Sequence, residues 1–441
     1  MDLHALEQSP REDDYLFGPG AAWFAFAMTL ALMVFDYVDR QVIVSLFPFI
    51  KAEWELSDKQ LGALVSVVSI TVALGALPVA LIADRASRVK SIVVMATVWS
   101  LATISCMWAR SYGALLAARS VVGMGEAGYG SVGAALISSH FPARMRGALL
   151  AGFFAAASVG SVLGVLLGGW IASHWGWQAA FGVVGIPGLV VALLYLKVRD
   201  YHTVELKPEL DAKRRSLGEA AMHIVRLLLR SKTMLWVCVG GAAQLISVSA
   251  LWSWLPSFLN RVHGVDPAQA GAKAAVVVLA GALGSVVWGA VVDRLGMRHP
   301  RRKLAVLTLL CLVSMAVLAY AFGTAHEPAV QLAWIVLGGF LATCSVGPVS
   351  AIVIDVIHPG VRATGASVLA LFQNLFGLAA GPFLVGVLSD GMGLQAALTA
   401  VPMASVLAAV AFTIAARSYE GDKARAAEPI EAAPRARPAA A

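Results

Sequence analysis

Two apolar stretches in the first third of the chain carry charged side chains. They cover residues 21–46 and 113–140, and their charges are Asp36, Asp39, Arg40, Arg119 and Glu126. A charge within an apolar helix that crosses a membrane is costly and usually marks a functional site. A carboxylate that exchanges an arginine partner can bind and release a proton, whereas arginine keeps its charge. We therefore expect Asp39 and Glu126 to carry protons alternately or jointly, with Arg119 as their switching partner.

The spacing of these charges predicts which of them meet. Arg119 and Glu126 are seven residues apart, so they share one helix face and lie about 10 Å apart along its axis. Asp39 and Arg119 lie at similar depths in their stretches and can pair if the two helices are neighbours. The competing interpretation is a permanent salt bridge that only joins the helices. Asp36 either takes part in the coupling or caps and lines the cavity.

The composition identifies the elements that must hold these charges. Of 441 residues, 59% are hydrophobic and 13% are charged, against about 25% charged in soluble domains. This argues against a soluble enzyme, a secreted disulfide scaffold and a disordered chain. A membrane core about 30 Å thick needs about 20 apolar helical residues per span. Twelve such segments lie near 21–46, 58–83, 91–109, 113–140, 147–173, 178–196, 234–260, 269–292, 304–325, 328–354, 363–389 and 394–416.

The basic residues predict how the chain crosses the membrane. Most of the 33 Lys and Arg residues fall in connections on one side of the spans, which is the pattern of cytoplasmic loops. We therefore expect an integral membrane protein with both termini in the cytoplasm, and the Ala- and Arg-rich composition suggests a bacterial inner membrane. The linker segment 218–230 has the pattern of an amphipathic surface helix. The expected domains are a tail over 1–20, a six-helix bundle over 21–196, a linker over 197–233, a second bundle over 234–416 and a disordered tail over 417–441.

The second half of the chain repeats motifs of the first. The connection after the second span contains Asp84, Arg85 and Arg88, and the connection after the eighth contains Asp293, Arg294 and Arg298. Carboxylates and arginines there can bind the ends of neighbouring helices and form a latch that breaks when this side opens. The alternative is ordinary capping and membrane topology. Two repeated six-helix halves are typical of a transporter.

These motifs also carry a family resemblance. The segment Gly289-Ala-Val-Val-Asp293-Arg294-Leu-Gly296-Met-Arg298 resembles the loop signature of the major facilitator superfamily, whereas the copy at 80–88 has Ala80 and Ser87 where glycine is usual. Four further segments resemble the spinster branch, namely Phe35-Asp-Tyr-Val-Asp39-Arg40, Leu56-Ser-Asp-Lys-Gln60-Leu-Gly62, Ala83-Asp84-Arg85-Ala-Ser-Arg88 and Ala118-Arg119-Ser-Val-Val-Gly-Met-Gly125-Glu126.

The resemblance implies an all-α polytopic membrane protein with the major facilitator fold. Its twelve transmembrane helices would form two six-helix pseudo-repeats that open alternately by a rocker switch. The spinster branch implies transport of lysophospholipids or sphingoid lipids, coupled to protons.

Five residues are expected to line the substrate cavity, namely Arg40, Gln244, Trp252, Gln373 and Asn374. Uncharged amides within a span need hydrogen-bond partners, whereas tryptophans near the outer surface can instead anchor the chain at the membrane interface. The second half has no charge in the middle of a span, which suits an amphiphile whose head meets the charged half. A small organic anion, such as a carboxylate or aromatic acid, that pairs with Arg119 or Arg40 suits the sequence equally.

Motifs of other functional classes do not occur in the sequence. There is no HExxH and no Walker motif, so we expect neither an enzyme nor an ATP-driven pump. An intramembrane enzyme or a receptor is a remote alternative. The expected partners are protons, a small-molecule or lipid substrate and the lipid bilayer. We expect no nucleic acid, no metal, no cofactor beyond the proton gradient, and a monomer.

Overall fold

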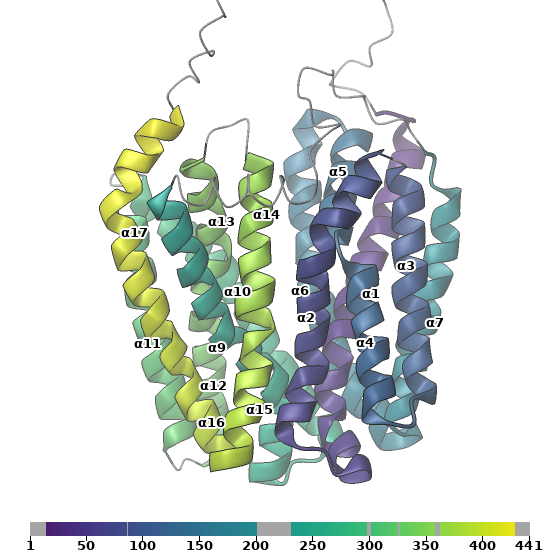
Figure 1. The fold of residues 1–441 in the computed structure, drawn as a ribbon, viewed down its shortest axis with the longest axis vertical. Coiled ribbons are helices and arrows are strands. Elements are labelled where there is room, and N and C mark those ends of the chain that lie inside the picture. Colours follow the sequence, from purple (N-terminus) through teal and green to yellow (C-terminus); the bar gives the residue numbers. More distant parts are fainter. Residues whose placement is uncertain are drawn as a thin grey trace, which may run out of the picture.

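The computed structural model describes residues 15–85, 87–200, 231–297, 301–324, 327–357 and 362–427. Within them the chain forms two groups of upright helices, the amino-terminal half on the right of Figure 1 and the carboxy-terminal half on the left. We call the face at which the described chain begins and ends the termini face, and the opposite face the far face. The amphipathic helix expected at 218–230 lies outside the described residues.

The helices coincide with the predicted spans, and most extend a few residues beyond them. The amino-terminal half contains α1 (Pro19–Trp54), α2 (Asp58–Arg85), α3 (Arg88–Ser105), α4 (Tyr112–Glu126), α5 (Tyr129–His140), α6 (Ala143–Trp175) and α7 (Trp177–Leu194). The carboxy-terminal half contains α9 (Lys232–His263), α10 (Pro267–Gly296), α11 (Arg301–Gly323), α12 (Pro328–Ala342), α13 (Val346–Asp355), α14 (Arg362–Phe372), α15 (Ala380–Met392), α16 (Leu394–Ala400) and α17 (Ala404–Ala427).

One predicted span is broken in the middle. Eleven described helical segments are long and apolar enough to cross a membrane, and the remaining predicted span, 113–140, is divided into α4 and α5. The break lies at Ala127 and Gly128, where Gly128 has a φ of +82°, a left-handed conformation that glycine adopts without strain. The break therefore directly follows Glu126, the last residue of α4.

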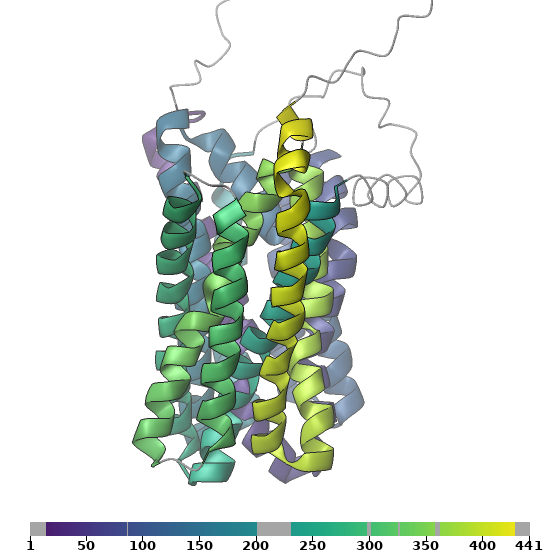
Figure 2. The ribbon, with the colours of Figure 1, turned by 90° about the vertical axis from the view of Figure 1, so that its left-hand side faces the viewer.

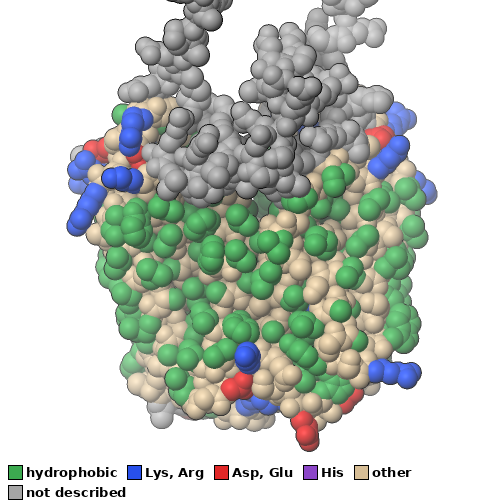
Figure 3. All heavy atoms as spheres, viewed as in Figure 1, with side chains coloured by type: hydrophobic (Ala, Val, Ile, Leu, Met, Phe, Trp, Pro, Cys, Tyr) green, Lys and Arg blue, Asp and Glu red, His purple; other side chains and the backbone are tan. Residues whose placement is uncertain are grey.

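The outer surface is that of an integral membrane protein. In Figure 3 hydrophobic side chains cover the middle of the molecule, while Lys, Arg, Asp and Glu side chains lie toward its two ends. Large apolar side chains such as Ile82, Leu283, Val286 and Leu309 are more than half exposed. Contiguous apolar surface of this kind is rare on soluble monomers, whereas lipid tails accommodate it.

Glycines on α6 fix the position of α1, which carries three of the predicted site residues. Gly160, Gly164 and Gly168 recur at four-residue spacing and pack against the α1 backbone. A Cβ atom at Gly164 would lie 2.6 Å from the Val38 carbonyl oxygen, and one at Gly168 would lie 2.6 Å from the Val42 carbonyl oxygen. Small residues allow membrane helices to approach this closely, so the contact sets the register of α1.

The tail that was expected to be disordered from residue 417 is helical over its first part, because α17 continues to Ala427. In Figure 2 α17, in yellow, runs along the outside of the carboxy-terminal half toward the termini face. The Asp422 carboxylate accepts a hydrogen bond from the Thr233 backbone N–H at 2.8 Å, and the Tyr419 hydroxyl donates to Asp355 at 2.7 Å. The prediction was wrong here because Asp422 caps the start of α9 and Tyr419 binds the Asp355 carboxylate at the end of α13. The remaining tail, 428–441, lies outside the described residues.

Candidate functional site

Asp39 and Arg119 form one of the buried ion pairs in the amino-terminal half. Arg119 Nη1 on α4 donates to Asp39 Oδ1 on α1 at 3.0 Å and to the Asp39 backbone oxygen at 3.3 Å. Thr103 on α3 donates a hydrogen bond from its hydroxyl to Asp39 Oδ2. All three side chains are buried. The contact that the sequence predicted between Asp39 and Arg119 is therefore present, and three helices hold it.

Arg40, rather than Arg119, is the arginine that contacts Glu126 in this conformation. The Arg40 Nε atom lies 2.8 Å from Asp36 Oδ1 and 3.0 Å from Glu126 Oε2, and the Arg40 guanidinium lies over the Tyr37 ring. Along α4, Arg119 is two turns from Glu126, which is about 10 Å, whereas Arg40 reaches Glu126 from α1. The expected exchange of Arg119 between Asp39 and Glu126 stays a prediction, since in this conformation Arg119 is paired with Asp39.

We call these five residues, Asp36, Asp39, Arg40, Arg119 and Glu126, the charged cluster. It combines three carboxyl groups with two guanidinium groups. The Glu126 side chain is 0% exposed, and no group among the described residues donates a hydrogen bond to either of its oxygens. The Arg40 side chain is 17% exposed, so the cluster reaches accessible space there. Uncompensated buried charge is costly, and such groups bind a counter-charge or become neutral.

Gln244 and Trp252 on α9 were both expected at the substrate cavity. The buried Gln244 amide donates to Ser314 Oγ at 3.1 Å and to the Ala342 carbonyl at 2.9 Å, so it joins α9 to α11 and α12. The Gln244 amide oxygen is buried and has no hydrogen-bond partner among the described residues, so the expected contact of this amide with a substrate stays a prediction. Trp252 is half-buried and packs beside Gly281 of α10, where an added Cβ atom would lie 3.2 Å from the ring.

Gln373 and Asn374 lie in a π-helical turn, Gln373–Leu378 (η7), between α14 and α15. Both side chains are half-buried, and the Asn374 amide donates to the Ala370 carbonyl at 2.9 Å within the same helix. π-Helical turns are frequent at functional sites. These two amides therefore stay candidates for contact with a substrate.

The repeated loop motifs make contacts within their own halves. Arg88 donates to Ser139 Oγ at 3.4 Å in the amino-terminal half. In the carboxy-terminal half, Lys303 Nζ lies 3.4 Å from Asp293 Oδ1 and 3.5 Å from Asp355 Oδ2. The partner of Asp293 is thus a lysine in the first turn of the next helix, α11. Arg294 is exposed, and the side chains of Asp84, Arg85 and Arg298 lie outside the described residues.

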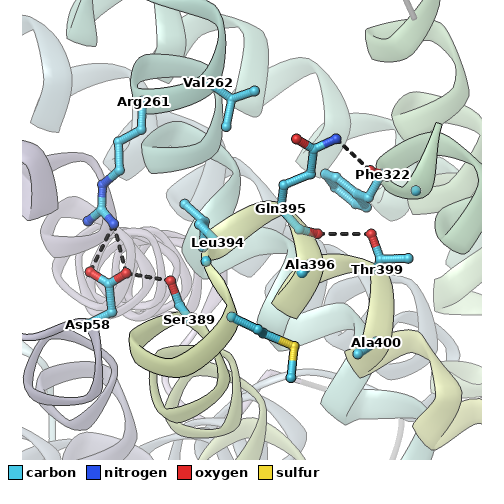
Figure 4. Close-up of a pocket in the computed structure, with 13 residues that line it drawn as sticks. Asp58, Arg261, Val262, Phe322, Ser389, Leu394, Gln395, Ala396, Thr399 and Ala400 are labelled. Atoms are coloured by element: carbon cyan, nitrogen blue, oxygen red, sulfur yellow. Dashed lines mark hydrogen bonds and ion pairs between the residues drawn. The ribbon is translucent and has the colours of Figure 1, made fainter. Parts of the chain in front are cut away.

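A second polar cluster, which the sequence pattern did not predict, joins the two halves at the far face (Figure 4). Asp58 at the start of α2 accepts hydrogen bonds from Arg261 Nη1 at 2.8 Å on both of its oxygens. It also accepts hydrogen bonds from the Ser389 hydroxyl at 2.5 Å and from Lys51 Nζ at 2.6 Å. Arg261 belongs to α9 and Ser389 to α15, so Asp58 binds two helices of the other half.

Asp390 of α15 caps α2 across the same boundary. Its two carboxylate oxygens accept hydrogen bonds from the backbone N–H groups of Asp58 and Lys59, at 2.8 and 3.0 Å. A hollow of about 830 Å³ opens beside these residues, with Phe322 and Gln395 in its lining. The sequence does place charged residues at the ends of these spans, but it does not indicate that they meet. We call Lys51, Asp58, Arg261, Ser389 and Asp390 the far-face cluster.

The fold and its buried charges correspond to a known class of membrane proteins. The sequence matches the family model of the Major Facilitator Superfamily over residues 29–382 and 237–440. The chain belongs to this superfamily and is a membrane transporter, not an enzyme. A solved structure of a bacterial homologue of the human lysosomal transporter spinster, in an inward-facing and unoccupied conformation, aligns with a TM-score of 0.80 at 22% identity. The alignment covers 91% of this chain and 98% of that chain, which confirms the predicted fold.

Similar sequences come from several transporters. The MFS-type efflux pump of Mycolicibacterium smegmatis is 29% identical over 415 residues, 92% of this chain and 95% of the relative. Protein spinster of Drosophila melanogaster is 25% identical over 382 residues, 84% of this chain and 62% of the relative. The niacin transporter NiaP of Acinetobacter baylyi is 26% identical over 376 residues, 79% of this chain and 83% of the relative. The predicted resemblance to the spinster branch is confirmed, and it stands beside a similarity to other transporters.

Proposed function

We propose that the chain is a proton-coupled secondary transporter in which the charged cluster binds and releases the driving proton. The observation that carries the proposal is the unequal number of acids and bases. Asp36 and Glu126 both form ion pairs with Arg40, whereas Asp39 forms its ion pair with a different residue, Arg119. When both Asp36 and Glu126 are ionised, one buried negative charge is left without compensation. One proton on this carboxyl pair makes the cluster neutral.

The geometry supports different roles for the three carboxyl groups. Asp39 accepts hydrogen bonds on both oxygens, from Arg119 and Thr103, so we assign it to a fixed anchor in this conformation. Asp36 Oδ1 and Glu126 Oε2 lie 2.8 and 3.0 Å from the same Arg40 Nε atom, so a proton on one of these two carboxyl groups leaves the other paired with the guanidinium group. The break in the helix directly after Glu126 leaves that carboxyl group at the end of a helical segment, where it can reorient.

We assign the termini face to the cytoplasm of a bacterial cell, because basic residues concentrate in the connections on that side. Hydrogen bonds and an ion pair that join the halves lie toward the far face, including those of Asp58 with Arg261 and Ser389 and those of Asp390 with α2. This arrangement supports an inward-facing conformation. Rocking of one six-helix half against the other then exposes the charged cluster to each side in turn.

We further propose an amphiphilic lipid, such as a lysophospholipid or sphingoid lipid, as the substrate. The likeness to spinster proteins supports this class. The distribution of charge supports it as well, because the charged cluster belongs to the amino-terminal half and the spans of the other half lack charges in their middles. A polar head group would bind beside Arg40, and the hydrocarbon chain would lie against the apolar half.

A small organic anion is the second candidate. The similarity to a niacin transporter supports it, and so does the accessible surface of Arg40. A substrate carboxylate that binds Arg40 would displace Glu126, and the displaced carboxylate would then take up a proton. Substrate binding and proton uptake would thus be coupled at one guanidinium group.

Reconstituted proteoliposomes with an imposed pH gradient test the proposal. Uptake of labelled lysophospholipid or niacin is measured together with proton movement, reported by a trapped pH-sensitive dye. We expect Glu126→Gln and Asp36→Asn to abolish gradient-driven accumulation, because each variant leaves two acids and two bases and removes the shared proton site. Substrate binding should persist, and a raised melting temperature in the presence of substrate reports it.

Glu420→Gln serves as the matched control, since Glu420 forms an exposed ion pair with Arg301 away from the cluster. It should transport like the wild type. Undiminished accumulation and proton movement in the Glu126→Gln/Asp36→Asn double variant would overturn the proposal.

A further inference from the structure

We infer that the far-face cluster is a lock that holds the far face shut, and that Asp58 is its switching residue. This inference rests on the proposed function, in which the two faces of the transporter open in turn. Asp58 and Lys51 belong to the amino-terminal half, whereas Arg261, Ser389 and Asp390 belong to the carboxy-terminal half. The Asp58 carboxylate is buried and binds donors from both halves. Opening of the far face must therefore separate it from Arg261 and Ser389.

The backbone of α2 takes part in the same lock. The first N–H groups of a helix have no partner within the helix, and here Asp390 of the other half supplies one for Asp58 and Lys59. A carboxylate at this end of a helix also interacts favourably with the helix dipole. Separation of the halves breaks these bonds together with the side-chain contacts of Asp58.

Close backbone contacts make the lock sensitive to small displacements. A Cβ atom at Gly386 of α15 would lie 2.8 Å from the Asp58 carbonyl carbon, and one at Gly62 of α2 would lie 2.9 Å from the Pro382 carbonyl carbon. The rings of Phe47 and Trp254 also meet across the boundary, with centroids 5.1 Å apart. The lock therefore forms only when α2 and α15 are in direct contact, which is the behaviour of a two-state element.

Lys51 explains how the lock can open without leaving a bare carboxylate. It binds Asp58 at 2.6 Å from within the same half, so it keeps this partner when the halves separate. Arg261 loses Asp58, but its side chain is already 24% exposed and lies 5.8 Å from the Trp254 ring centroid, so water can solvate it once the halves separate. Removal of Lys51 should consequently penalise the open state more than the closed state.

Distances across the far face, measured by pulsed electron paramagnetic resonance on the reconstituted full-length chain, test this inference. Spin labels at Arg110→Cys and Glu327→Cys report on one far-face connection in each half, and the native cysteines are all buried. We expect Asp58→Asn and Arg261→Met each to raise the ratio of open to closed far faces by about tenfold, the effect of losing one hydrogen bond to a charged group. Lys51→Met should change this ratio in the opposite direction.

Arg301→Ala is the control, because it breaks an exposed ion pair on the termini face. It should leave the distances unchanged. The inference is overturned if Asp58→Asn and Arg261→Met show wild-type distances, or if Lys51→Met opens the far face as they do. The distances require neither substrate nor a pH gradient, so that outcome would leave the proposed proton coupling intact. Wild-type distances that stay fixed at every pH and with every substrate would instead count against the alternation itself.

Discussion

Asp39 and Glu126 belong to one cluster, yet their surroundings differ in kind. Asp39 receives hydrogen bonds from a guanidinium group and a hydroxyl group on two other helices. Glu126 has an ion-pair contact with Arg40, and no described group donates a hydrogen bond to its oxygens. A carboxylate with complete hydrogen bonding is held in place, whereas one without it gains from a change of partner or of protonation. The difference supports the roles that we propose, Asp39 as an anchoring residue and Glu126 as a mobile one.

The anchoring role predicts a stability effect. Asp39→Asn leaves the buried Arg119 guanidinium without a counter-charge, and loss of one partner from a buried pair costs about 3–5 kcal/mol. The double variant Asp39→Asn/Arg119→Gln removes both charges and should recover most of this loss. Unfolding of the purified variants in detergent measures both effects as a double-mutant cycle. A double variant that is as unstable as the sum of its single variants would show that the pair is not coupled.

At the scale of elements, the stripe of glycines on α6 connects packing to chemistry. Asp36, Asp39 and Arg40 occupy one helix, so any displacement of α1 moves all three against α4. Gly164 faces the α1 backbone at the level of Val38, one residue before Asp39. The contact therefore supports the geometry of the charged cluster, although its glycines have no side chain that could take part in the ion pairs.

A substitution on this stripe should harm both stability and transport. The Cβ atom of Gly164→Leu would lie 2.6 Å from the Val38 carbonyl oxygen, and overpacking of this kind costs about 1–3 kcal/mol or more. Gly147→Leu on the same helix is the matched control, because no atom lies within 4 Å of its Cβ position. Thermal unfolding and proteoliposome flux of the two variants provide the comparison. Equal melting temperatures and equal flux for the two variants would mean that this contact does not hold α1 against α6.

The sequence predicts where the helices lie better than where they break. Length and apolarity locate the spans, because any helix that crosses the bilayer must satisfy both. The break at Gly128 lies in a run of several glycines and coincides with a φ of +82° and a close approach to α2, where an added Cβ atom would lie 3.2 Å from Val79. Ser87, a departure from the family signature, accepts a hydrogen bond from the Lys90 N–H and caps α3. Such local details follow from packing and capping, which the hydrophobic pattern does not encode.

At the scale of the whole molecule, the spacing of residues along the helices predicts some contacts of the two clusters and misses others. Spacing along a helix gives the depth of a residue, and depth was enough to pair Asp39 with Arg119. Depth does not fix the rotation of a helix about its axis, so the contact of Arg40 with Glu126 was missed. The far-face cluster was missed for another reason: Asp58 meets Arg261 and Ser389 from distant parts of the chain, and only the assembled halves bring them together.

The two clusters differ in how their residues are distributed over the two halves. The charged cluster belongs to one half, so the proton chemistry that we propose lies within a single six-helix unit. The far-face cluster draws its members from both halves, so closure depends on their relative position. Coupling then requires that protonation within one unit changes how well it fits the other, which is a difference in free energy between two states.

In the orientation that we propose, with the termini face in the cytoplasm, the contact between the halves at the far face can be reached by a protein ligand from outside the cell. A nanobody whose epitope spans the start of α2 and the end of α15 would bridge the boundary and hold it shut. We expect such a nanobody to arrest flux in right-side-out vesicles without entering the translocation path, whereas one raised against a single half should bind equally well and leave flux intact. Flux that continues under a saturating bridging nanobody would mean that this contact does not have to part during the cycle.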